Sequence, residues 1–365
     1  MEKINENIRA FKNLSTKAVN KNSRTIVFSC SDNYAPFLAV TLKSIIENTK
    51  KKLNYDFYVL TTDLSPENQI KLKEIVESSN SHLFHCVNIS VLLYNQSFFT
   101  SEHITAETYY RLFAIHLFSN LEKFIYLDSD LILNSDISFL FDIDLQNNYL
   151  AAVRDVEIAG LVKKDANQWE YLKNVIGYNK IGEYFQAGVL IFNMHEIKKK
   201  IAVEQLLSVL NERQWRYWDQ DILNHVFNGK VLYLDQKWNV LMNWKIGEKS
   251  RMDIMKNAPY DLYEEYLDAR KKPYIIHYAG SQKPWNYSPC DYSDYFWKYA
   301  RQTVFYEEII WRFASSAKND LSDKVDAIQK NLQSRKFFIK LALGKGILYK
   351  LAKKIYSLFR KFKIK

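Results

Sequence analysis

The amino-acid sequence predicts an α/β fold with a mostly parallel central sheet. Three observations predict it. Apolar, strand-like runs recur along the chain, helix-like segments separate them through the first half, and 47% of the 365 residues are hydrophobic. A chain of this size and composition can bury one large core or two smaller ones.

The first elements alternate in this way. Residues 24–30 (RTIVFSC) are apolar and β-branched, which predicts a buried strand. A helix is predicted next from apolar residues at helical spacing: Leu38, Leu42, Ile45 and Ile46. DFYVL at 56–60 predicts a second strand. The following helix is expected to begin at SPEN (65–68), with Ser65 as N-cap and Pro66 at the first helical position.

The later elements are less regular. A third apolar stretch covers 83–91, and KFIYLDSDLIL at 123–133 predicts one strongly hydrophobic strand interrupted by two acids. Further strands are predicted at 187–193 (AGVLIFN) and 272–278 (KPYIIHY). Residues 291–330 are rich in aromatic and charged side chains without a strand pattern, so we expect helices packed beside the sheet.

Composition excludes several kinds of site. Glycine is scarce, at 9 residues, and neither the P-loop spacing nor the dinucleotide fingerprint occurs, so a bound nucleotide would need other groups to neutralise its phosphates. The three cysteines, Cys30, Cys86 and Cys290, lie far apart, which indicates reduced thiols rather than disulfides or a zinc site. The first 22 residues lack the apolar core of a signal peptide, and no run approaches the roughly 18 apolar residues of a membrane span. We therefore expect neither export by an obvious signal nor an integral membrane protein.

The net charge of +10 is concentrated near the end of the sequence. Residues 335–365 hold 11 Lys and Arg and no acid, which leaves 40 basic against 41 acidic residues, a net charge of −1, elsewhere. Apolar residues there recur at steps of three and four, at Leu348, Leu351, Ile355, Leu358 and Phe362. This pattern predicts a basic amphipathic helix, which we interpret as a segment that binds an anionic membrane surface. A helix docked on its own domain and a nucleic-acid-binding arm are the alternatives.

Asp128-Ser129-Asp130 is the sharpest local feature, because it follows the apolar run 124–127. Residues two apart on a strand face the same side, so the two carboxylates could converge on one hard cation such as Mn²⁺ or Mg²⁺. The same spacing occurs at Asp142/Asp144 and Asp219/Asp221. The preceding buried strand separates 128–130 from these pairs, because buried carboxylates need a compensating cation or donor. A solvated strand end or a structural ion pair is the alternative.

His277 follows the strand-like run 273–276 and opens the sequence HYAGSQKPW. Gly280 permits a close backbone approach, and Lys283 offers a cation for a phosphate. An imidazole beside two carboxylates is a reasonable ligand for Mn²⁺, whereas a hydrogen-bonded packing histidine is the alternative. WDQDILN at 218–224 is typical of a helix start, with acids near its positive end, and a capped helix without further role is the alternative there.

Six segments together resemble one family. They are IVFSCSDNYAPFLAVTLKSI, HITAETYYRL at 103–112, YLDSD, FQAGVL, WDQDILN and HYAGSQKPW. Their order and spacing resemble the bacterial members of glycosyltransferase family 8, of the lipopolysaccharide galactosyl- and glucosyltransferase type, over residues 24–300. The resemblance implies a GT-A (Rossmann-like) fold, a UDP-hexose donor, Mn²⁺ (with Mg²⁺ possible as a substitute) and retention of anomeric configuration.

The resemblance also implies roles for single residues. Asp128, Asp130 and His277 would hold the metal. Asn33 and Tyr34, with the backbone around Ser29, would hold the uridine. Two positions depart from the family pattern: Ser31 stands where an aspartate often contacts uracil, and Gln186 replaces the asparagine of F-N-A-G-V, which affects sugar contacts and donor choice.

The remaining donor contacts are implied in the same way. The second motif supplies His103, Thr108 and Arg111, of which Arg111 would face the donor, and Ser129 lies between the two aspartates. The transferred sugar would be contacted by Asp155, Asp219 and Gln220. The diphosphate would be contacted by Gly280 and Lys283. Because Gln220 is a poor nucleophile, we hypothesise a front-face mechanism instead of a covalent intermediate.

The favoured hypothesis is thus a retaining, Mn-dependent hexosyltransferase that moves galactose or glucose from a UDP-sugar to a glycan or glycolipid such as a lipopolysaccharide core. A catalytically silent GT-A domain and a nucleic-acid-binding protein are the alternatives, and the net charge of −1 outside the tail argues against nucleic acid. We expect a cytoplasmic protein at the inner face of the cell membrane. The predicted organisation is a polar extension (1–22), a catalytic domain (23–290), a helical region (291–330) and a basic tail (331–365).

Overall fold

The computed structural model of the chain describes residues 24–49, 53–78, 82–93, 106–201, 208–210, 212–246, 249–286 and 290–316, with Lys330, Lys354 and Ser357. The chain forms two compact units, Met1–Pro284 with Ser288–Ile309, and Trp285–Tyr287 with Ile310–Lys365. The elements and the site described below belong to the first unit. Among the described residues, none of the helices combines the length and apolar character needed to cross a bilayer.

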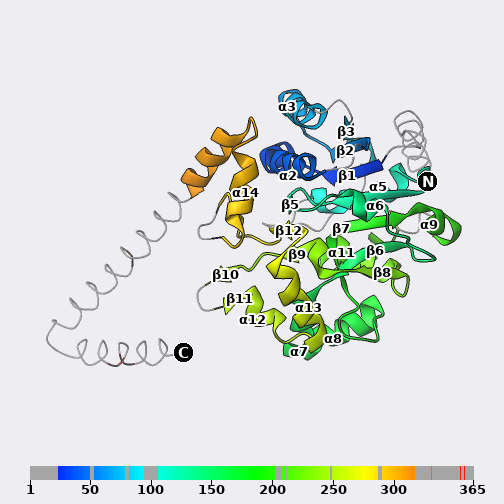
Figure 1. The fold of residues 1–365 in the computed structure, drawn as a ribbon. Coiled ribbons are helices and arrows are strands. Elements are labelled where there is room, and N and C mark those ends of the chain that lie inside the picture. The colour runs from blue at the N-terminus through cyan, green and yellow to red at the C-terminus, as the bar shows by residue number, and fades with distance from the viewer. Residues whose placement is uncertain are drawn as a thin grey trace. The chain divides into compact units, whose positions relative to one another are not determined.

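A seven-stranded sheet forms the centre of the first unit (Figure 1). Its strands, in spatial order, are β3 (His82–Asn88), β2 (Tyr55–Thr61), β1 (Arg24–Ser29), β4 (Lys123–Leu127), β7 (Phe185–Asn193), β6 (Leu150–Arg154) and β8 (Val231–Leu234). The pairs β1–β2, β2–β3, β1–β4 and β6–β8 are parallel, and β7 runs antiparallel to both β4 and β6. The predicted α/β fold with a mostly parallel sheet is confirmed.

Helices and turns connect the strands. The helices are α2 (Ala35–Asn48), α3 (Pro66–Glu77), α4 (Ser90–Leu93), α5 (Tyr110–Leu117), α6 (Ser138–Phe141), α7 (Val156–Lys164), α8 (Ala166–Tyr171), α9 (Met194–Lys200), α11 (Trp218–Val226), α12 (Arg251–Met255), α13 (Tyr260–Lys271) and α14 (Ser293–Ala300). The described residues also form three 3₁₀ turns, η1 (Asp32–Tyr34), η2 (Ala106–Tyr109) and η4 (Gln236–Asn239), and one π-helical turn, η3 (Leu172–Ile176).

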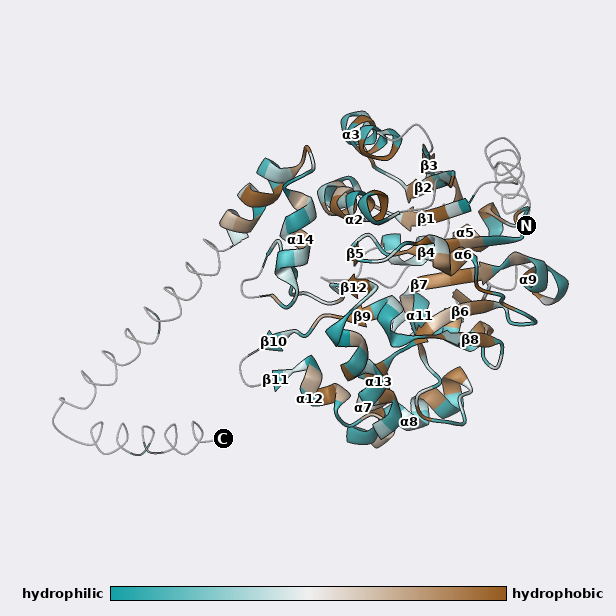
Figure 2. Ribbon diagram, viewed as in Figure 1, coloured by the Kyte–Doolittle hydropathy of each residue, from teal (hydrophilic) through white to brown (hydrophobic). Residues whose placement is uncertain are grey.

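The hydrophobic pattern explains why these segments form a layered core. Figure 2 shows hydrophobic colour along β4, β6 and β7, and both colours on α2 and α3. The strand β2 is buried along its whole length, because helices cover parallel sheets on both faces. The helix α3 begins as predicted, with Pro66 in its first turn and Ser65 accepting a hydrogen bond from the Asn68 amide at 3.3 Å.

The segment 123–133 corrects one expectation. It does not form a single strand: β4 ends at Leu127, and β5 (Leu131–Leu133) belongs to a separate three-stranded sheet with β12 (Ile275–His277) and β9 (Val240–Leu241). The chain turns at residues 128–130, because aspartate and serine are poor strand formers. Apolar sequence on both sides of the turn conceals this break.

The turn is held by a helix behind it. The hydroxyl of Thr41, on α2, donates to the Leu131 carbonyl at 2.8 Å and accepts from the Leu131 amide at 3.3 Å. Ser44, one helical turn later, accepts from the Leu133 amide at 3.0 Å. These bonds satisfy backbone groups that a continuous strand would have paired within the sheet.

Two further features of the first unit lie outside these sheets. A two-stranded ribbon pairs β10 (Lys245–Ile246) with β11 (Lys249–Ser250). Within the range 291–330, α14 is joined to α2 by a hydrogen bond from Asn48 to the Tyr299 hydroxyl at 2.7 Å. The predicted domain boundaries stay predictions. The predicted extension over 1–22 lies outside the described residues, and so does the tail over 331–365 apart from Lys354 and Ser357.

Candidate active site and metal centre

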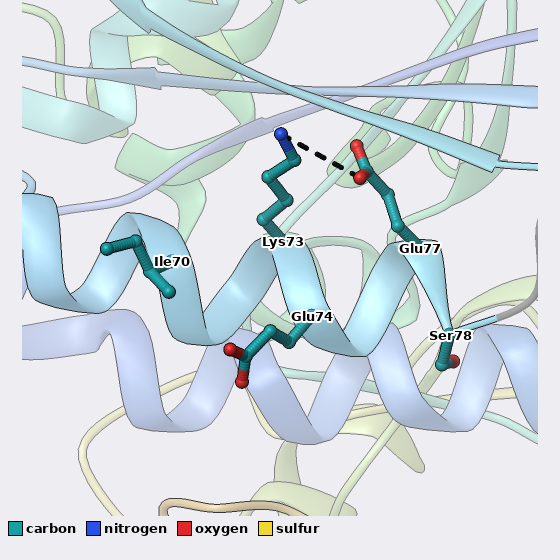
Figure 3. Close-up of a pocket in the computed structure, with 5 residues that line it drawn as sticks. All are labelled: Ile70, Lys73, Glu74, Glu77 and Ser78. Carbon is teal, nitrogen blue, oxygen red and sulfur yellow. Dashed lines mark ion pairs between the residues drawn. The ribbon is translucent and has the colours of Figure 1, made fainter.

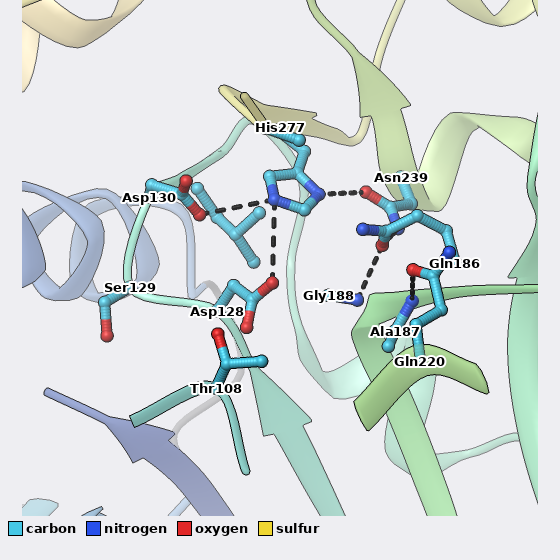
Figure 4. Close-up of polar contacts among 12 residues, drawn as sticks. Thr108, Asp128, Ser129, Asp130, Gln186, Ala187, Gly188, Gln220, Asn239 and His277 are labelled. Atoms are coloured by element: carbon cyan, nitrogen blue, oxygen red, sulfur yellow. Dashed lines mark hydrogen bonds and ion pairs between the residues drawn. The ribbon is translucent and has the colours of Figure 1, made fainter. Parts of the chain in front are cut away.

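The two aspartates and the histidine singled out by the sequence converge in the structure (Figure 4). One ligand atom from each of Asp128, Asp130 and His277 lies within 4.8 Å of the others. The His277 Nε2 atom is 3.3 Å from Asp130 Oδ1 and 3.6 Å from Asp128 Oδ2. The carboxylates converge across a turn, and not along one strand as expected.

Strand pairing places these groups. Asp128 follows β4 and donates its amide to the Gly188 carbonyl of β7 at 2.9 Å. Asp130 precedes β5, which pairs antiparallel with β12 so that Leu131 lies opposite His277. The site therefore lies where β4 leaves the large sheet and meets the small one, at the carboxyl end of a parallel strand. That is where α/β folds commonly bind ligands.

The site needs a glycine at residue 188. A Cβ atom there would lie 2.4 Å from His277 Cε1 and 2.9 Å from Asp128 Oδ2. Both contacts are shorter than side-chain atoms tolerate, and both involve proposed ligands. Gly188 thus leaves space beside the imidazole and the carboxylate that any other residue would fill.

Arg111 joins the metal centre to a second acidic residue. Its Nη2 atom is 2.8 Å from Asp128 Oδ1, and its Nε atom is 2.9 Å from Asp219 Oδ2. Its Nη1 atom donates to the Ala187 carbonyl, and its guanidinium lies 4.7 Å from the centre of the Tyr126 ring. Burial would lower the pKa of Arg111, but Asp128 and Asp219 raise it, so the side chain carries its charge. These contacts are with protein groups, so a direct contact between Arg111 and the donor stays a prediction.

Lys283 lies against the second aspartate. Its ammonium donates to Asp130 Oδ2, and both side chains are largely buried. Burial acts to raise the pKa of Asp130, but Lys283 and His277 outweigh it and hold that pKa well below its usual value. Asp130 is therefore ionised, which is the state in which a carboxylate binds a cation.

Gln220 and Asp155 form a second polar cluster. The Ala187 amide donates to Gln220 Oε1 at 2.9 Å, and Gln220 Nε2 donates to Asp155 Oδ2 at 3.1 Å. Asp155 also caps α7 by accepting from the Ile158 amide at 2.9 Å. Burial, and then the charge of Glu157, raise the pKa of Asp155 to about 6. The structure thus brings Gln220 and Asp155 together beside β7.

Asp219 lies at the start of α11, next to a strained residue. Burial raises the pKa of Asp219 to about 7, against the opposing effect of Arg111. Trp218 has a φ of 50°, in the left-handed region that non-glycine residues rarely adopt. Such strain is often found at functional sites, and here it directs the chain into α11 just before Asp219.

The other acid of this motif has a structural role. Asp221 accepts hydrogen bonds from the hydroxyls of Tyr171 and Tyr184, and from the Tyr217 amide at 2.7 Å. Asn224 pairs with both backbone groups of Phe185 and fixes α11 against β7. Asp221 therefore has the structural role that a capped helix start implies. Asp219 instead forms an ion pair with Arg111.

The residues expected to hold uridine lie at the carboxyl end of β1. Ser129 donates to the Ser29 carbonyl at 2.6 Å, which ties this end of β1 to the turn between the aspartates. Ser31 precedes η1, which includes Asn33 and Tyr34. Burial, followed by the charges of Asp130 and Asp128, raises the pKa of Tyr34 well above its ordinary value. The structure brings these positions together at one edge.

The other predicted contacts are more dispersed. Thr108 lies in η2 and accepts at its carbonyl from Arg111 Nε at 3.0 Å, whereas His103 lies outside the described residues. Gly280 has a φ of 98°, which favours glycine, and a Cβ there would lie 3.3 Å from Arg251 Nη2. That arginine donates to the Ala279 carbonyl at 3.0 Å and so supports the loop that carries Lys283.

Sequence reasoning missed three groups that shape the centre: Thr41, Gly188 and Asn239. Asn239, in η4, accepts from His277 Nδ1 at 2.9 Å and is itself buried. None of the three stands out by spacing, because each acts through residues distant in the chain. Of the three, only Gly188 lies in a segment that the sequence had singled out: it follows Gln186 by two residues in FQAGVL.

A depression on α3 lies apart from this centre. It is lined by Ile70, Lys73, Glu74, Glu77 and Ser78, and Lys73 pairs with Glu77 at 3.8 Å (Figure 3). None of the residues of the metal centre lines it. Exposed side chains on one helix face explain it without a ligand.

The residues at the metal centre fit a divalent cation. Two carboxylates and an imidazole are ligands suited to Mn²⁺, and carboxylates also suit Mg²⁺. The space that Gly188 keeps open lies beside the same atoms. The second ring nitrogen of His277 is hydrogen bonded to a protein group, as is usual for histidine ligands.

Comparisons with known proteins agree with this geometry. The profile of the family described as Glycosyl transferase family 8 matches residues 25–288. The lipopolysaccharide 1,2-glucosyltransferase of Escherichia coli K12 is 24% identical over 265 residues, which cover 72% of each protein.

Two solved structures are also similar. The bifunctional glycosyltransferase WbbM matches with a TM-score of 0.73 and 33% identity over 81% of this chain, which spans 52% of that protein. The galactosyltransferase LgtC, solved with donor and acceptor sugar analogs, matches with a TM-score of 0.60 and 26% identity, over 77% of this chain and 96% of LgtC.

A substitution at the glycine tests the metal centre. We expect Gly188→Ala to weaken Mn²⁺ binding at least tenfold, because the new methyl group would displace His277 or Asp128, and to lower the free energy of unfolding by about 1–3 kcal/mol. Isothermal titration with Mn²⁺ and urea unfolding measure the two effects.

Gly229→Ala is the control for the added methyl group. Nothing lies within 4 Å of the added Cβ, so this variant has no steric effect on the centre, although a φ of 74° strains an alanine at this position. Equal Mn²⁺ affinity in the parental protein and Gly188→Ala would contradict the assignment.

Proposed function

The chain belongs to glycosyltransferase family 8 and has a GT-A fold, and from this premise we propose that it transfers galactose or glucose from a UDP-sugar to a glycan acceptor with retention of configuration. The observation that carries the proposal is the convergence of Asp128, Asp130 and His277, with Lys283 against Asp130. This arrangement provides oxygen and nitrogen ligands for a cation and a separate positive charge for a phosphate.

The chemistry of the donor explains why such a site is needed. As the glycosidic bond breaks, negative charge grows on the departing diphosphate. When bound by Asp128, Asp130 and His277, Mn²⁺ or Mg²⁺ would neutralise part of that charge. Lys283 would leave Asp130 for the diphosphate and add a charge-assisted hydrogen bond.

The residues of the second cluster suit the sugar. Positive charge develops at the anomeric carbon in the transition state, and the polar groups of Asp219, Gln220 and Asp155 lie on adjoining elements. Arg111 binds both Asp128 and Asp219, so it would fix the distance between the phosphate side and the sugar side of the site. Positioning of this kind contributes much of the rate in group transfer.

Retention is proposed to occur by front-face attack. Gln220 carries an amide, which is a weak nucleophile, and its side chain is already bonded to Asp155 and the Ala187 amide. Asp219 is paired with Arg111. In the proposed step, the acceptor hydroxyl bonds to the anomeric carbon as UDP leaves from the same face, and a phosphate oxygen of UDP takes the hydroxyl proton.

The acceptor is proposed to be a lipopolysaccharide or lipooligosaccharide core, because the similar E. coli protein is named a lipopolysaccharide 1,2-glucosyltransferase. Such acceptors are lipid-linked, so we propose that the enzyme works in the cytoplasm at the inner face of the cell membrane. The 11 basic residues between 335 and 365, with no acid among them, would draw that segment to anionic lipid.

Donor turnover tests the proposal. We expect hydrolysis of UDP-galactose or UDP-glucose, but not of both equally, to require Mn²⁺ and to stop when a chelator removes it. Asp130→Asn and His277→Ala should each lower the rate about 100-fold or more, because each removes a ligand of the proposed cation. Release of UDP across a panel of UDP-sugars measures this.

Asp144→Asn is the control for that experiment. It alters another Asp-x-Asp pair, at an exposed position outside the metal centre, and should leave the rate unchanged. Binding of UDP-sugar without any turnover in the parental protein would instead favour a catalytically silent domain.

The stereochemical proposal has its own test. Incubation with a slow fluorinated UDP-hexose, followed by intact mass spectrometry, should show no hexosyl adduct on the protein. Front-face attack passes through no covalent intermediate, so an adduct mapped to Asp219 or Asp155 would rule it out. The anomeric configuration of the product, read by NMR, should match that of the donor.

Cell fractionation tests the location. Deletion of 331–365 should move most of the protein from the membrane fraction to the soluble fraction, because it removes the basic and apolar residues together. Washing the parental membranes with high salt should release part of the protein, because salt screens the attraction between basic residues and anionic lipid. Unchanged membrane association of the shortened chain would contradict the proposal.

A further inference from the structure

A chain of hydrogen bonds runs from β7 to the imidazole of the metal centre. The Gly188 amide donates to Gln186 Oε1 at 2.5 Å, and Asn239 Nδ2 donates to the same oxygen at 2.5 Å. Asn239 Oδ1 lies 2.9 Å from His277 Nδ1 (Figure 4). Asn239 and His277 are both at least 97% buried, so water does not compete for the bond between them.

The direction of every bond in this chain follows from its first member. A backbone N–H group can only donate, so Gln186 must present its oxygen to Gly188. That oxygen requires a donor from Asn239, which must turn its NH₂ group toward Gln186. The amide oxygen of Asn239 then faces His277 and can only accept, so the hydrogen atom of that bond lies on Nδ1.

The carboxylates on the other side of the ring favour the opposite arrangement. Asp130 and Asp128 lie 3.3 and 3.6 Å from Nε2, and each would attract a hydrogen atom on that nitrogen. A neutral imidazole with its hydrogen on Nε2 would present no lone pair to a cation between the carboxylates. A free Asn239 could support that form by rotating its amide and donating to Nδ1.

We propose that Gln186 and Asn239 are positioning residues that keep the hydrogen on His277 Nδ1 and thereby reserve Nε2 for the divalent cation. The inference rests on the proposed metal-dependent function. Neither residue needs to touch the cation, because both act through the orientation of an amide. The anchor is the backbone of Gly188, which also provides the space beside the ligands.

The proposal assigns Gln186 a role in orienting Asn239 that follows from the contacts in this chain. The family that the sequence resembles commonly has asparagine at this position, and its side chain is one methylene shorter. Gln186 lies on β7 and Asn239 on η4, 53 residues apart, and the longer side chain spans the two elements. Its Oε1 atom accepts two hydrogen bonds there, one from Gly188 and one from Asn239.

Mn²⁺ affinity of the 365-residue chain, measured by isothermal titration, provides the first test. We expect Gln186→Leu and Asn239→Leu to weaken binding about 10- to 100-fold, the usual effect of losing a hydrogen-bond partner behind a metal ligand. Gln186→Glu keeps an acceptor of the same length, so its affinity should stay within about threefold of the parental value. Thermal unfolding of each variant checks that the fold is retained.

The ring nitrogens of His277 provide the second test, which needs no metal. In protein with ¹⁵N-labelled histidine, two-bond ¹H–¹⁵N correlation spectra distinguish a protonated from an unprotonated Nδ1, and the His277→Gln variant identifies the signals among the 7 histidines. We expect protonated Nδ1 in the parental protein and in Gln186→Glu. In Gln186→Leu a measurable fraction should carry an unprotonated Nδ1.

The two tests separate the two proposals. A parental protein that binds no Mn²⁺ but shows protonated Nδ1 would remove the metal-dependent function and keep the hydrogen-bond chain. An unprotonated Nδ1 in the parental protein would overturn the inference, whatever the metal affinity. Unchanged affinity and unchanged spectra in both leucine variants would overturn it equally. Should Gln186→Leu fail to fold, Asn239→Leu and the parental spectrum still decide.

Discussion

The candidate site depends on how the negative charges of two carboxylates, brought together at a turn, are balanced by neighbouring groups. Asp128 and Asp130 lie close enough to share one imidazole, and negative charges at that separation are stable in a partly buried site only beside cations or donors. Arg111 forms an ion pair with Asp128, and Lys283 forms an ion pair with Asp130. Arg111 is also bound to Asp219 and to a backbone carbonyl, so it links Asp128 to a second acidic residue.

The fold supplies this arrangement through the antiparallel strand β7. Because β7 enters the sheet beside the carboxyl end of β4, its first residues lie next to Asp128, and its two amides at Ala187 and Gly188 point to different side chains. One amide orients Gln220 toward Asp155, and the other orients Gln186 toward Asn239. The short segment 186–188 therefore sets the geometry on both the sugar side and the metal side of the proposed site. The metal side also requires a glycine at residue 188.

Local patterns in the sequence predicted most of this fold and singled out the three side chains that converge at the candidate metal centre. Buried strands such as 24–30 are visible because they are continuous apolar runs, and the cap at Ser65 is visible because its partners are adjacent in the chain. The break after Leu127 was not visible, since apolar residues flank it and the turn is held by Thr41, about 90 residues earlier. Asn239 was missed for the same reason: its partners lie 38 and 53 residues away, and nothing in its neighbours indicates a buried amide.

Gln186 shows how such long-range contacts alter the meaning of a motif. Taken as a departure from a family pattern, it directs attention to the donor sugar, because that is where the motif is expected to act. In the structure its oxygen is committed to Gly188 and Asn239, so the position bears first on the imidazole. A donor contact remains open to its NH₂ group alone, which can donate but not accept. Any sugar hydroxyl that this NH₂ group binds must therefore use its oxygen as the acceptor.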